Sequence, residues 1–489
     1  MADRKFSAVE DRHPSAHDVI ANDRKVKVVN DNEITGASGI TTRQSIVPVC
    51  LVTILFFLWG FAYGLLDVLN QHFQETLNVT NTQAADLSGA YFGAYFLGPL
   101  TYSGWCVRRF GYRWTFIIGL CIYGVGALMF WPAAVKRSFG GFVGAMFIVG
   151  SGLSTLETSA NPYIAVCGPP KYSEMRLNLS QAFQAIGTVV APLLAARVFF
   201  NNVGGPGGKS LDSVQWTYLG IAVFVFLLSV VFFFAPIPEI TDADMNDSEE
   251  QGALYETGYE DKPLLKQYRL FWGVAAQFCY VGGQVAIANY FIKYCIKVKP
   301  GTSSSRGSDL LAVAQGLFAI GRFVAGFSMK VLKPRLILWI FMTMIIVFIS
   351  CTLGLEGSAG IACLSLVLFF ESCIFPTIFT LSLRGLGRHT KRGASFLVAS
   401  VSGGAVFPPI LGAVTDARDV KIGMAVPLAA FLVSWSFPVY LNLFCAKDLD
   451  GYRGSHVGIV EGDDTSLEEG YSKDAETEKP IATAIEVAR

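Results

Sequence analysis

Two acidic residues stand within apolar stretches of this chain. Glu157 lies in "GSGLSTLETSANPYIAV", with Asn161 one helical turn later, and Asp67 lies in "FAYGLLDVLNQHF". In an apolar helix, such a residue usually faces a partner or a water-filled cavity. There, a carboxylate binds a proton from one side and releases it to the other, and it accepts strong hydrogen bonds from hydroxyl groups. The pattern therefore predicts proton transfer, binding of a hydroxylated molecule, or both.

Polar side chains recur at helical spacing around both acids. Residues three or four positions apart share one face of a helix. Three such stripes occur: Tyr63, Asp67, Asn70 and Gln71; Gly150, Ser154, Glu157 and Asn161; and Asn178, Gln181, Gln184 and Thr188. Because a polar stripe is unfavourable against lipid, we expect the three to converge on an interior cavity.

A later stretch extends the pattern, since Gln277, Tyr280 and Gln284 predict a further cavity wall, with Asn289 beyond them. We predict that Asp67 and Glu157 are the proton-coupling residues. The predicted substrate-binding residues are Asn70, Gln71, Glu157, Asn161, Gln181, Gln184, Gln277, Gln284 and Asn289. For any single amide, the alternative is a hydrogen bond that only joins two packed helices.

Three further charged residues lie in or beside apolar stretches. Glu371 occupies the middle of one, and a functional and a structural role are both open for it. Arg322 and Arg384 lie near the ends of theirs, so we expect them to snorkel to the surface or to bind an inner gate.

The composition predicts a protein with many membrane spans. Of 489 residues, 52% are hydrophobic and only 16% are charged, and the charges cluster toward both termini. Apolar runs near 20 residues are long enough to cross a bilayer as helices. Twelve spans are expected, at about 46–69, 85–106, 113–132, 139–166, 177–200, 215–236, 270–295, 309–329, 334–355, 359–384, 394–415 and 423–445. The zero net charge gives no indication of a nucleic-acid partner.

A polar linker divides the spans six and six, and the two halves look related. Glu157 is followed five residues later by Pro162, and Glu371 is followed five residues later by Pro376. Weak internal symmetry is typical of transporters whose substrate sites lie near the midplane between repeats. We therefore predict an all-α membrane protein with twelve transmembrane helices in two pseudo-symmetric six-helix bundles.

The predicted organisation has five parts: a disordered tail at 1–45, an N-terminal bundle at 46–236, a linker at 237–269, a C-terminal bundle at 270–445 and a disordered acidic tail at 446–489. Lys and Arg are somewhat more frequent in the loops on the side of the two tails, which predicts that both termini are cytosolic. The sequon at Asn78 then lies outside, where glycosylation is an open alternative. No early apolar segment typical of a signal peptide is visible, and the plasma membrane is the expected location.

Several stretches resemble the fucose–proton symporter group of the major facilitator superfamily. The most specific are "LETSANPYIAVCGPP" and "RLNLSQAFQAIG", joined by "FFLWGFAYGLLDVLNQHFQ" and "FPTIFTLSLRGLGRHTKRGASFLV". The similarity covers most of the chain from about residue 50 to 445. The long polar tails and the acidic linker look like a fungal or other eukaryotic version.

The resemblance implies alternating access and uptake of a monosaccharide together with a proton. The family's two cavity acids fall on Asp67 and Glu157, and its Gln on the fifth span falls on Gln181. The amide three residues later is Asn in the bacterial fucose carrier and is Gln184 here, so the expected substrate is L-fucose or a related hexose such as galactose or glucose.

The predicted function is proton-coupled sugar uptake by a monomer in the bilayer, with a sugar and a proton as partners. The alternatives are a sugar facilitator without proton coupling and a transport-like sugar sensor. No enzyme, cofactor or metal site is expected, because the five His lie in tails or loops and the ten Cys form no C-x-x-C pair.

Overall fold

The computed structural model of the chain describes residues 42–77, 81–168, 172–194, 212–244, 263–446 and 449. For some helix residues, including 63, 65–77 and 81–86, the description covers the backbone alone. Every regular element in the described ranges is helical. The longer helices are α2 (Thr42–Leu77), α3 (Asn81–Leu100), α4 (Tyr102–Val135), α5 (Phe139–Val166), α6 (Ser173–Leu194), α7 (Asp212–Phe234), α9 (Tyr268–Val298), α10 (Ser304–Ser328), α11 (Pro334–Gly354), α12 (Gly357–Glu371), α13 (Ile374–Leu383), α14 (Thr390–Ala399), α15 (Gly403–Ala417) and α17 (Ala425–Leu443). Short elements are η5 (Leu264–Lys266), η6 (Gly387–His389), η7 (Ser400–Ser402) and α16 (Val420–Gly423).

Two of the expected spans are each built from two helices. The tenth span consists of α12 and α13, and the eleventh consists of α14 and α15 joined by η7. The expected second and third spans differ in the opposite way, because one helix runs across the loop expected between them. Helix α3 ends at Leu100, and α4 begins at Tyr102 and continues through a kink at Gly111, whose φ is 77°. Glycine adopts such a positive φ without steric strain, so the expected loop after the second span is reduced to a sharp change of helix direction.

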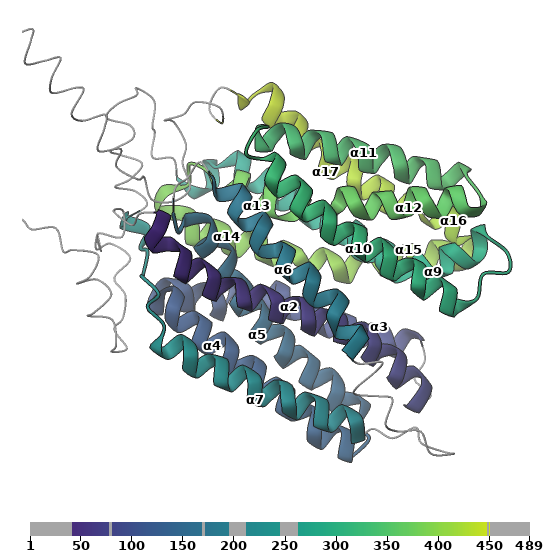
Figure 1. Ribbon diagram of the computed structural model, residues 1–489, viewed down its shortest axis with the longest axis horizontal. Helices are drawn as coiled ribbons and strands as arrows, with labels where there is room; N and C mark the ends of the chain where they lie inside the picture. The colour runs from purple at the N-terminus through teal and green to yellow at the C-terminus, as the bar shows by residue number, and fades with distance from the viewer. Residues whose placement is uncertain are drawn as a thin grey trace, which may run out of the picture.

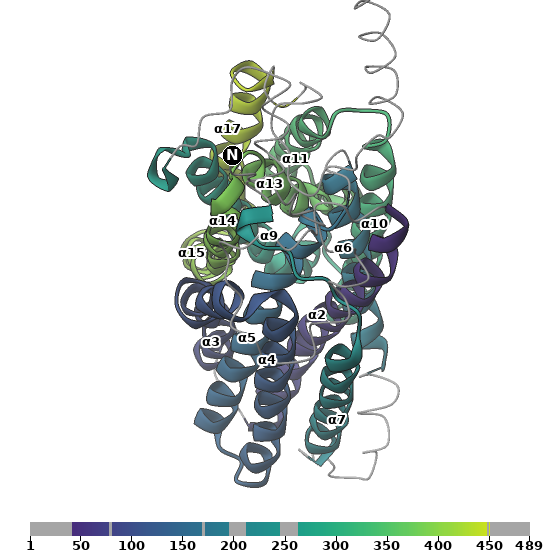
Figure 2. The ribbon, with the colours of Figure 1, turned by 90° about the vertical axis from the view of Figure 1, so that its left-hand side faces the viewer.

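The helices are arranged along a common long direction in two groups (Figure 1). Helices α3, α4, α5 and α7 form the lower group in this view, and α9, α11, α12, α15 and α17 form the upper group. Helix α6 packs against α2 on one side and against α10 on the other, so it lies where the groups meet. The view in Figure 2 shows the same separation, with α15 above α3. We call the end of the molecule that carries residues 235–244 and 263–267 the linker end.

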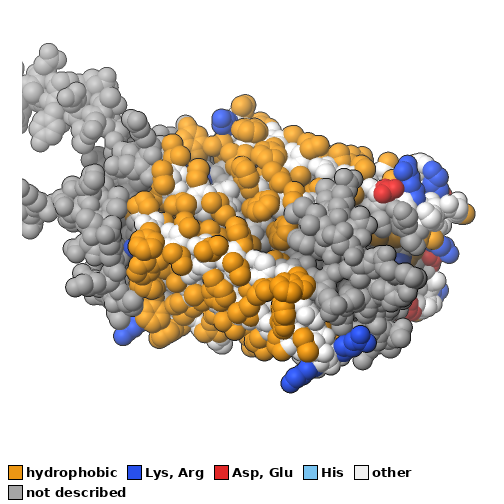
Figure 3. Space-filling model, turned by 60° about the horizontal axis from the view of Figure 1, so that its bottom comes forward, with side chains coloured by type: hydrophobic (Ala, Val, Ile, Leu, Met, Phe, Trp, Pro, Cys, Tyr) orange, Lys and Arg blue, Asp and Glu red, His pale blue; other side chains and the backbone are white. Residues whose placement is uncertain are grey.

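The surface and the helix lengths fit a bilayer. Within the described residues, nine helical stretches are long and apolar enough to cross a membrane, and a shorter apolar helix covers Tyr218–Phe234. Figure 3 shows a broad face of hydrophobic side chains with Lys, Arg, Asp and Glu at its margins. Large apolar side chains elsewhere on the helices, such as Phe224, Leu227 and Val433, are about half exposed or more. This exposure is typical of contact with lipid rather than water.

Small residues bring α4 and α5 together. A Cβ at Gly126 would lie 2.6 Å from the Val149 nitrogen, and one at Gly152 would lie 2.7 Å from the Tyr123 Cα. Close backbone approach through Gly is the usual means of helix packing in membranes. As a result, every side chain of α5 from Val149 to Val166 is buried, and Glu157 lies inside this segment.

Replacing Gly152 by Val should destabilise the fold. The new side chain meets the backbone of Tyr123, which cannot rotate away, and overpacking of this kind costs about 1–3 kcal/mol. Gly144 on the same helix has no atom within 4 Å of the added Cβ, so Gly144→Val is the matched control. We expect a lower melting temperature in detergent for Gly152→Val and little change for the control. Equal melting temperatures would contradict the packing described here.

Candidate functional site

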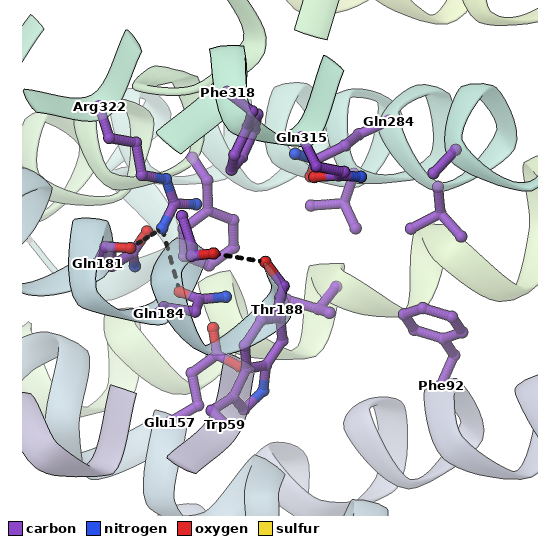
Figure 4. Close-up of a pocket in the computed structure, with 16 residues that line it drawn as sticks. Trp59, Phe92, Glu157, Gln181, Gln184, Thr188, Gln284, Gln315, Phe318 and Arg322 are labelled. Atoms are coloured by element: carbon purple, nitrogen blue, oxygen red, sulfur yellow. Dashed lines mark hydrogen bonds between the residues drawn. The ribbon is translucent and has the colours of Figure 1, made fainter. Parts of the chain in front are cut away.

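A cavity lies between the two groups of helices. It encloses about 770 Å³, including space open to solvent. Its polar lining consists of Glu157, Gln181, Gln184, Thr188, Gln284, Gln315 and Arg322. Its aromatic lining consists of Trp59, Phe92, Phe318 and Phe375, and Figure 4 shows most of these side chains around the space. The cavity is therefore bounded by α2, α3, α5 and α6 on one side and by α9, α10, α13 and η7 on the other.

Glu157 belongs to a chain of hydrogen bonds between α5 and α6. Asn161 donates from Nδ2 to Glu157 Oε1 at 3.2 Å, and Gln181 donates from Nε2 to Asn161 Oδ1 at 3.1 Å. All three side chains are buried. The second carboxyl oxygen, Oε2, has no hydrogen-bond partner among the described residues. Oε1 is thus held by Asn161, and the Tyr95 hydroxyl also interacts with this buried carboxyl.

Arg322 connects the two groups of helices across the cavity. Its Nη1 donates to the Gln181 main-chain oxygen and, at 3.2 Å, to Gln184 Oε1 on α6. Its Nε donates at 3.0 Å to the main-chain oxygen of Ser372, where α12 ends. The guanidinium also lies over the Phe318 ring, 4.8 Å from its centroid. Figure 4 shows both bonds to α6.

The position of Arg322 corrects the expectation that it snorkels to the surface. The side chain is only 4% exposed and lines the cavity beside the acid-bearing wall. Gln315, Phe318 and Arg322 follow one another at intervals of three and four residues, so they share one face of α10. The same periodicity argument, applied to the eighth span, would have placed Gln315 and Arg322 on one face, but not at the depth of the cavity.

The remaining predicted binding residues separate into three sets. Gln184 and Gln284 line the cavity from opposite sides. Gln277 is buried outside the lining and donates to the Phe375 main-chain oxygen at 3.4 Å, and Asn289 is exposed on the surface of α9. Asp67, Asn70 and Gln71 lie on α2, but their side chains fall outside the described residues, as does the sequon at Asn78.

The linker end is closed by contacts between the two groups. Arg384 forms an ion pair with Glu174 of α6, with 2.6 Å between Nη2 and Oε1. Asn178 of α6 donates to Thr377 of α13 at 3.3 Å. The expectation that Arg384 binds an inner gate agrees with this placement between the halves.

A second ion pair at the linker end involves the connecting segment itself. Both Glu239 oxygens accept the Tyr112 main-chain N–H, at 2.8 and 2.9 Å, where the kink at Gly111 leaves that N–H outside the helix ladder. Lys391 of α14 lies 3.8 Å from the same carboxylate and 5.1 Å from the Tyr112 ring centroid. The linker thus joins α4 to the opposite group of helices through one buried carboxylate.

Comparisons with known proteins agree with this architecture. Residues 52–409 match the family model described as Major Facilitator Superfamily. The L-fucose-proton symporter of Escherichia coli (strain K12) is 32% identical over 415 residues, which cover 81% of this chain and 93% of that protein. A glucose/galactose transporter of Brucella abortus is 30% identical over 385 residues, 78% of this chain and 90% of that protein. The crystal structure of the transporter FucP in the outward conformation matches with a TM-score of 0.71 at 30% identity, covering 81% of this chain and 99% of that chain.

Proposed function

Because the chain belongs to the major facilitator superfamily, with the two-bundle helical membrane fold of that family, we propose that it carries a monosaccharide and a proton across a membrane by alternating access. The central cavity between two groups of helices is the position expected for a transporter site. The relatives named as an L-fucose-proton symporter and as a glucose/galactose transporter support a sugar substrate. The observation that carries the proposal is Glu157, a buried acid that lines a cavity together with amides and aromatic rings.

The lining suits the two kinds of surface that a sugar presents. The Glu157 carboxylate accepts hydrogen bonds from hydroxyl groups and makes them charge-assisted. Gln184 has its oxygen engaged by Arg322, so its amide N–H groups are left to donate to ring or hydroxyl oxygens. Gln284 and Gln315 supply polar groups from the opposite wall, and Trp59 and Phe92 supply apolar faces for the C–H groups of the ring.

We assign proton coupling to Glu157 and Asp67. Asn161 and Gln181 act by fixing the Glu157 carboxyl, since their hydrogen bonds lead to its Oε1. Asn70 and Gln71 remain proposed sugar ligands on the helix that bears Asp67. The cavity lining favours Gln184 and Gln284 as direct sugar ligands over Gln277 and Asn289.

The orientation proposed here places the linker end in the cytosol and the protein in the plasma membrane. Basic residues such as Arg109, Arg384 and Lys391 gather at this end, as the positive-inside rule requires. The ion pairs that close the linker end then leave the cavity closed toward the cytosol. We take the halves at 46–236 and 270–445 as the two units that move against each other.

The proposal is tested by uptake into liposomes of labelled L-fucose, D-galactose, D-glucose and N-acetylglucosamine, with and without an inward proton gradient. We expect gradient-driven accumulation of at least one hexose by the wild type and its loss in Asp67→Asn. Equal uptake of a sugar with and without the gradient would instead make the protein a facilitator. Binding without transport of any of the four sugars would contradict uptake and favour a sensor.

A further inference from the structure

The C-terminal half contains a buried carboxyl group that the proposed mechanism does not use. Glu371 is the last residue of α12 and is 1% exposed. Its Oε1 has no hydrogen-bond partner among the described residues, and no ion pair found among them includes Glu371. The C-terminal half therefore contains a buried carboxyl group that forms no ion pair within the described part of the chain.

The main chain is broken at this residue. Helix α12 ends at Glu371 and α13 begins at Ile374, and the Ser372 carbonyl lacks its usual helix partner because Pro376 has no N–H. The Tyr280 hydroxyl donates to the Glu371 main-chain oxygen at 2.6 Å, and Arg322 Nε donates to the next one, of Ser372, at 3.0 Å. Ser372 Oγ is buried and has no partner among the described residues. A line of polar groups thus connects the cavity residue Arg322 to Glu371.

The side chains that the neighbouring helices place around Glu371 do not balance the charge of an ionised Glu371 carboxylate. Helix α9 contributes Tyr280, and α10 contributes Arg322, whose hydrogen bonds go to main-chain oxygens and to Gln184. The break contributes the buried Cys373. Helix α11 contributes Phe341, which packs on Phe369 and Phe370 of α12.

An ionised carboxylate in such surroundings is strongly unfavourable, because its lost hydration is replaced by neither a cation nor hydrogen-bond donors. A neutral acid loses far less on burial. The arrangement therefore holds Glu371 as a carboxylic acid in the conformation that is closed at the linker end. Ionisation requires water or a cation, and therefore a rearrangement of the helix break.

Glu371 also occupies the position in the second half that Glu157 occupies in the first. Each acid is followed five residues later by a proline, Pro162 and Pro376, within related spans. The helix that follows the break carries Phe375, which lines the cavity. A change in cavity occupancy at Phe375 therefore acts on the helix that begins three residues after Glu371.

We propose that Glu371 is a further proton-binding site, protonated in the conformation closed at the linker end and deprotonated to water when that end opens. The step is simple dissociation: the carboxyl O–H breaks, and the proton leaves to solvent. This inference rests on the proposed function, because it adds a proton-binding acid in the C-terminal half to the two assigned to the N-terminal half of the same transporter.

The test compares Glu371→Gln with the wild type in liposomes. Gln is neutral and nearly the same shape, so it preserves the packing but cannot release a proton. We expect sugar counterflow within about twofold of the wild type and gradient-driven accumulation at least tenfold lower. Accumulation equal to the wild type would overturn the proposal, since Glu371 would then be permanently neutral. Wild-type uptake that ignores the gradient would count against the proposed function itself, a separate failure.

A second measurement uses the wild-type chain and does not depend on the folding of the variant. Hydrophobic carbodiimides react with protonated buried carboxyls, and mass spectrometry locates the modification at residue 371. We expect labelling at pH 6 that decreases by at least fivefold at pH 9 in sugar-loaded liposomes. Labelling that stays constant across this range would overturn the proposal.

Discussion

Glu157→Gln should abolish gradient-driven sugar accumulation while leaving sugar exchange measurable. The substituted amide keeps an oxygen for the hydrogen bond from Asn161 at 3.2 Å, so the chain of bonds to Gln181 is preserved. What it loses is the ability to bind a proton at Oε2 and the charge that strengthens a hydrogen bond from a sugar hydroxyl. Internal sugar should then rise no higher than external sugar, whatever the proton gradient.

The expected change in sugar affinity decides how exchange must be measured. A hydrogen bond to a charged group contributes about 1.5–3 kcal/mol, against about 0.5–1.5 kcal/mol for a neutral one. The difference corresponds to roughly a tenfold weaker affinity. Counterflow should therefore be compared at saturating sugar, where this loss of affinity is masked and only translocation is measured.

Ser159→Ala is a matched control on the same helix. The Ser159 hydroxyl is buried and donates only to main-chain oxygens of its own helix, those of Thr155 and Leu156. We expect normal accumulation for this variant. Accumulation by Glu157→Gln at the wild-type level would show that this carboxyl does not couple the proton.

The sequence predicted the placement of those site residues whose position follows from the periodicity of a single helix. The spacing of Glu157, Asn161 and Gln181 was sufficient because α5 and α6 are neighbours, and a polar stripe in each must meet the other. The same argument did not reach Arg322, because its depth depends on how α10 packs against α6. Periodicity within α9 also did not distinguish the cavity face, with Gln284, from the outer face, with Asn289.

The break between α12 and α13 has a local signal in the sequence. Pro376 has no N–H for the Ser372 carbonyl four residues earlier, and its ring meets that group, so a break before it is expected. The tertiary partners that compensate the break, namely Tyr280 and Arg322, could not be predicted from this signal. At Gly111 a local signal also existed, but its partner, Glu239, lies far along the chain in the linker.

Arg384→Met should open the linker end of the protein. In the closed state, the Glu174 carboxylate is 1% exposed, Arg384 lies 2.6 Å away, and Arg176 also interacts with it. Removing one partner of a buried ion pair costs about 3–5 kcal/mol, and the remaining interaction with Arg176 places Arg384→Met at the lower end of this range. When the two halves separate at this end, water reaches Glu174 and the cost disappears. The substitution therefore destabilises the closed state alone, and 3 kcal/mol corresponds to roughly a hundredfold shift toward the open state.

A cysteine at position 395 measures this shift. Ser395 is buried on α14, and a Cβ at Gly104 of α4 would lie 2.8 Å from its hydroxyl, so the residue sits between the halves. We expect a membrane-impermeant maleimide, added from the linker end, to label Ser395→Cys much faster in the Arg384→Met background. The parent protein without Ser395→Cys gives the contribution of the native cysteines.

Two variants separate opening of the linker end from a general effect of lost charge. Arg109 is an exposed basic residue at the same end, so Arg109→Met should leave the labelling rate unchanged. The exchanged pair Glu174→Arg with Arg384→Glu restores opposite charges across the interface and should return the rate toward that of the wild type.

An unchanged rate in Arg384→Met would mean that closure rests on the Lys391–Glu239 pair and the apolar contacts around it. In that case Lys391→Met, which removes the cation 3.8 Å from the Glu239 carboxylate, becomes the substitution expected to open this end.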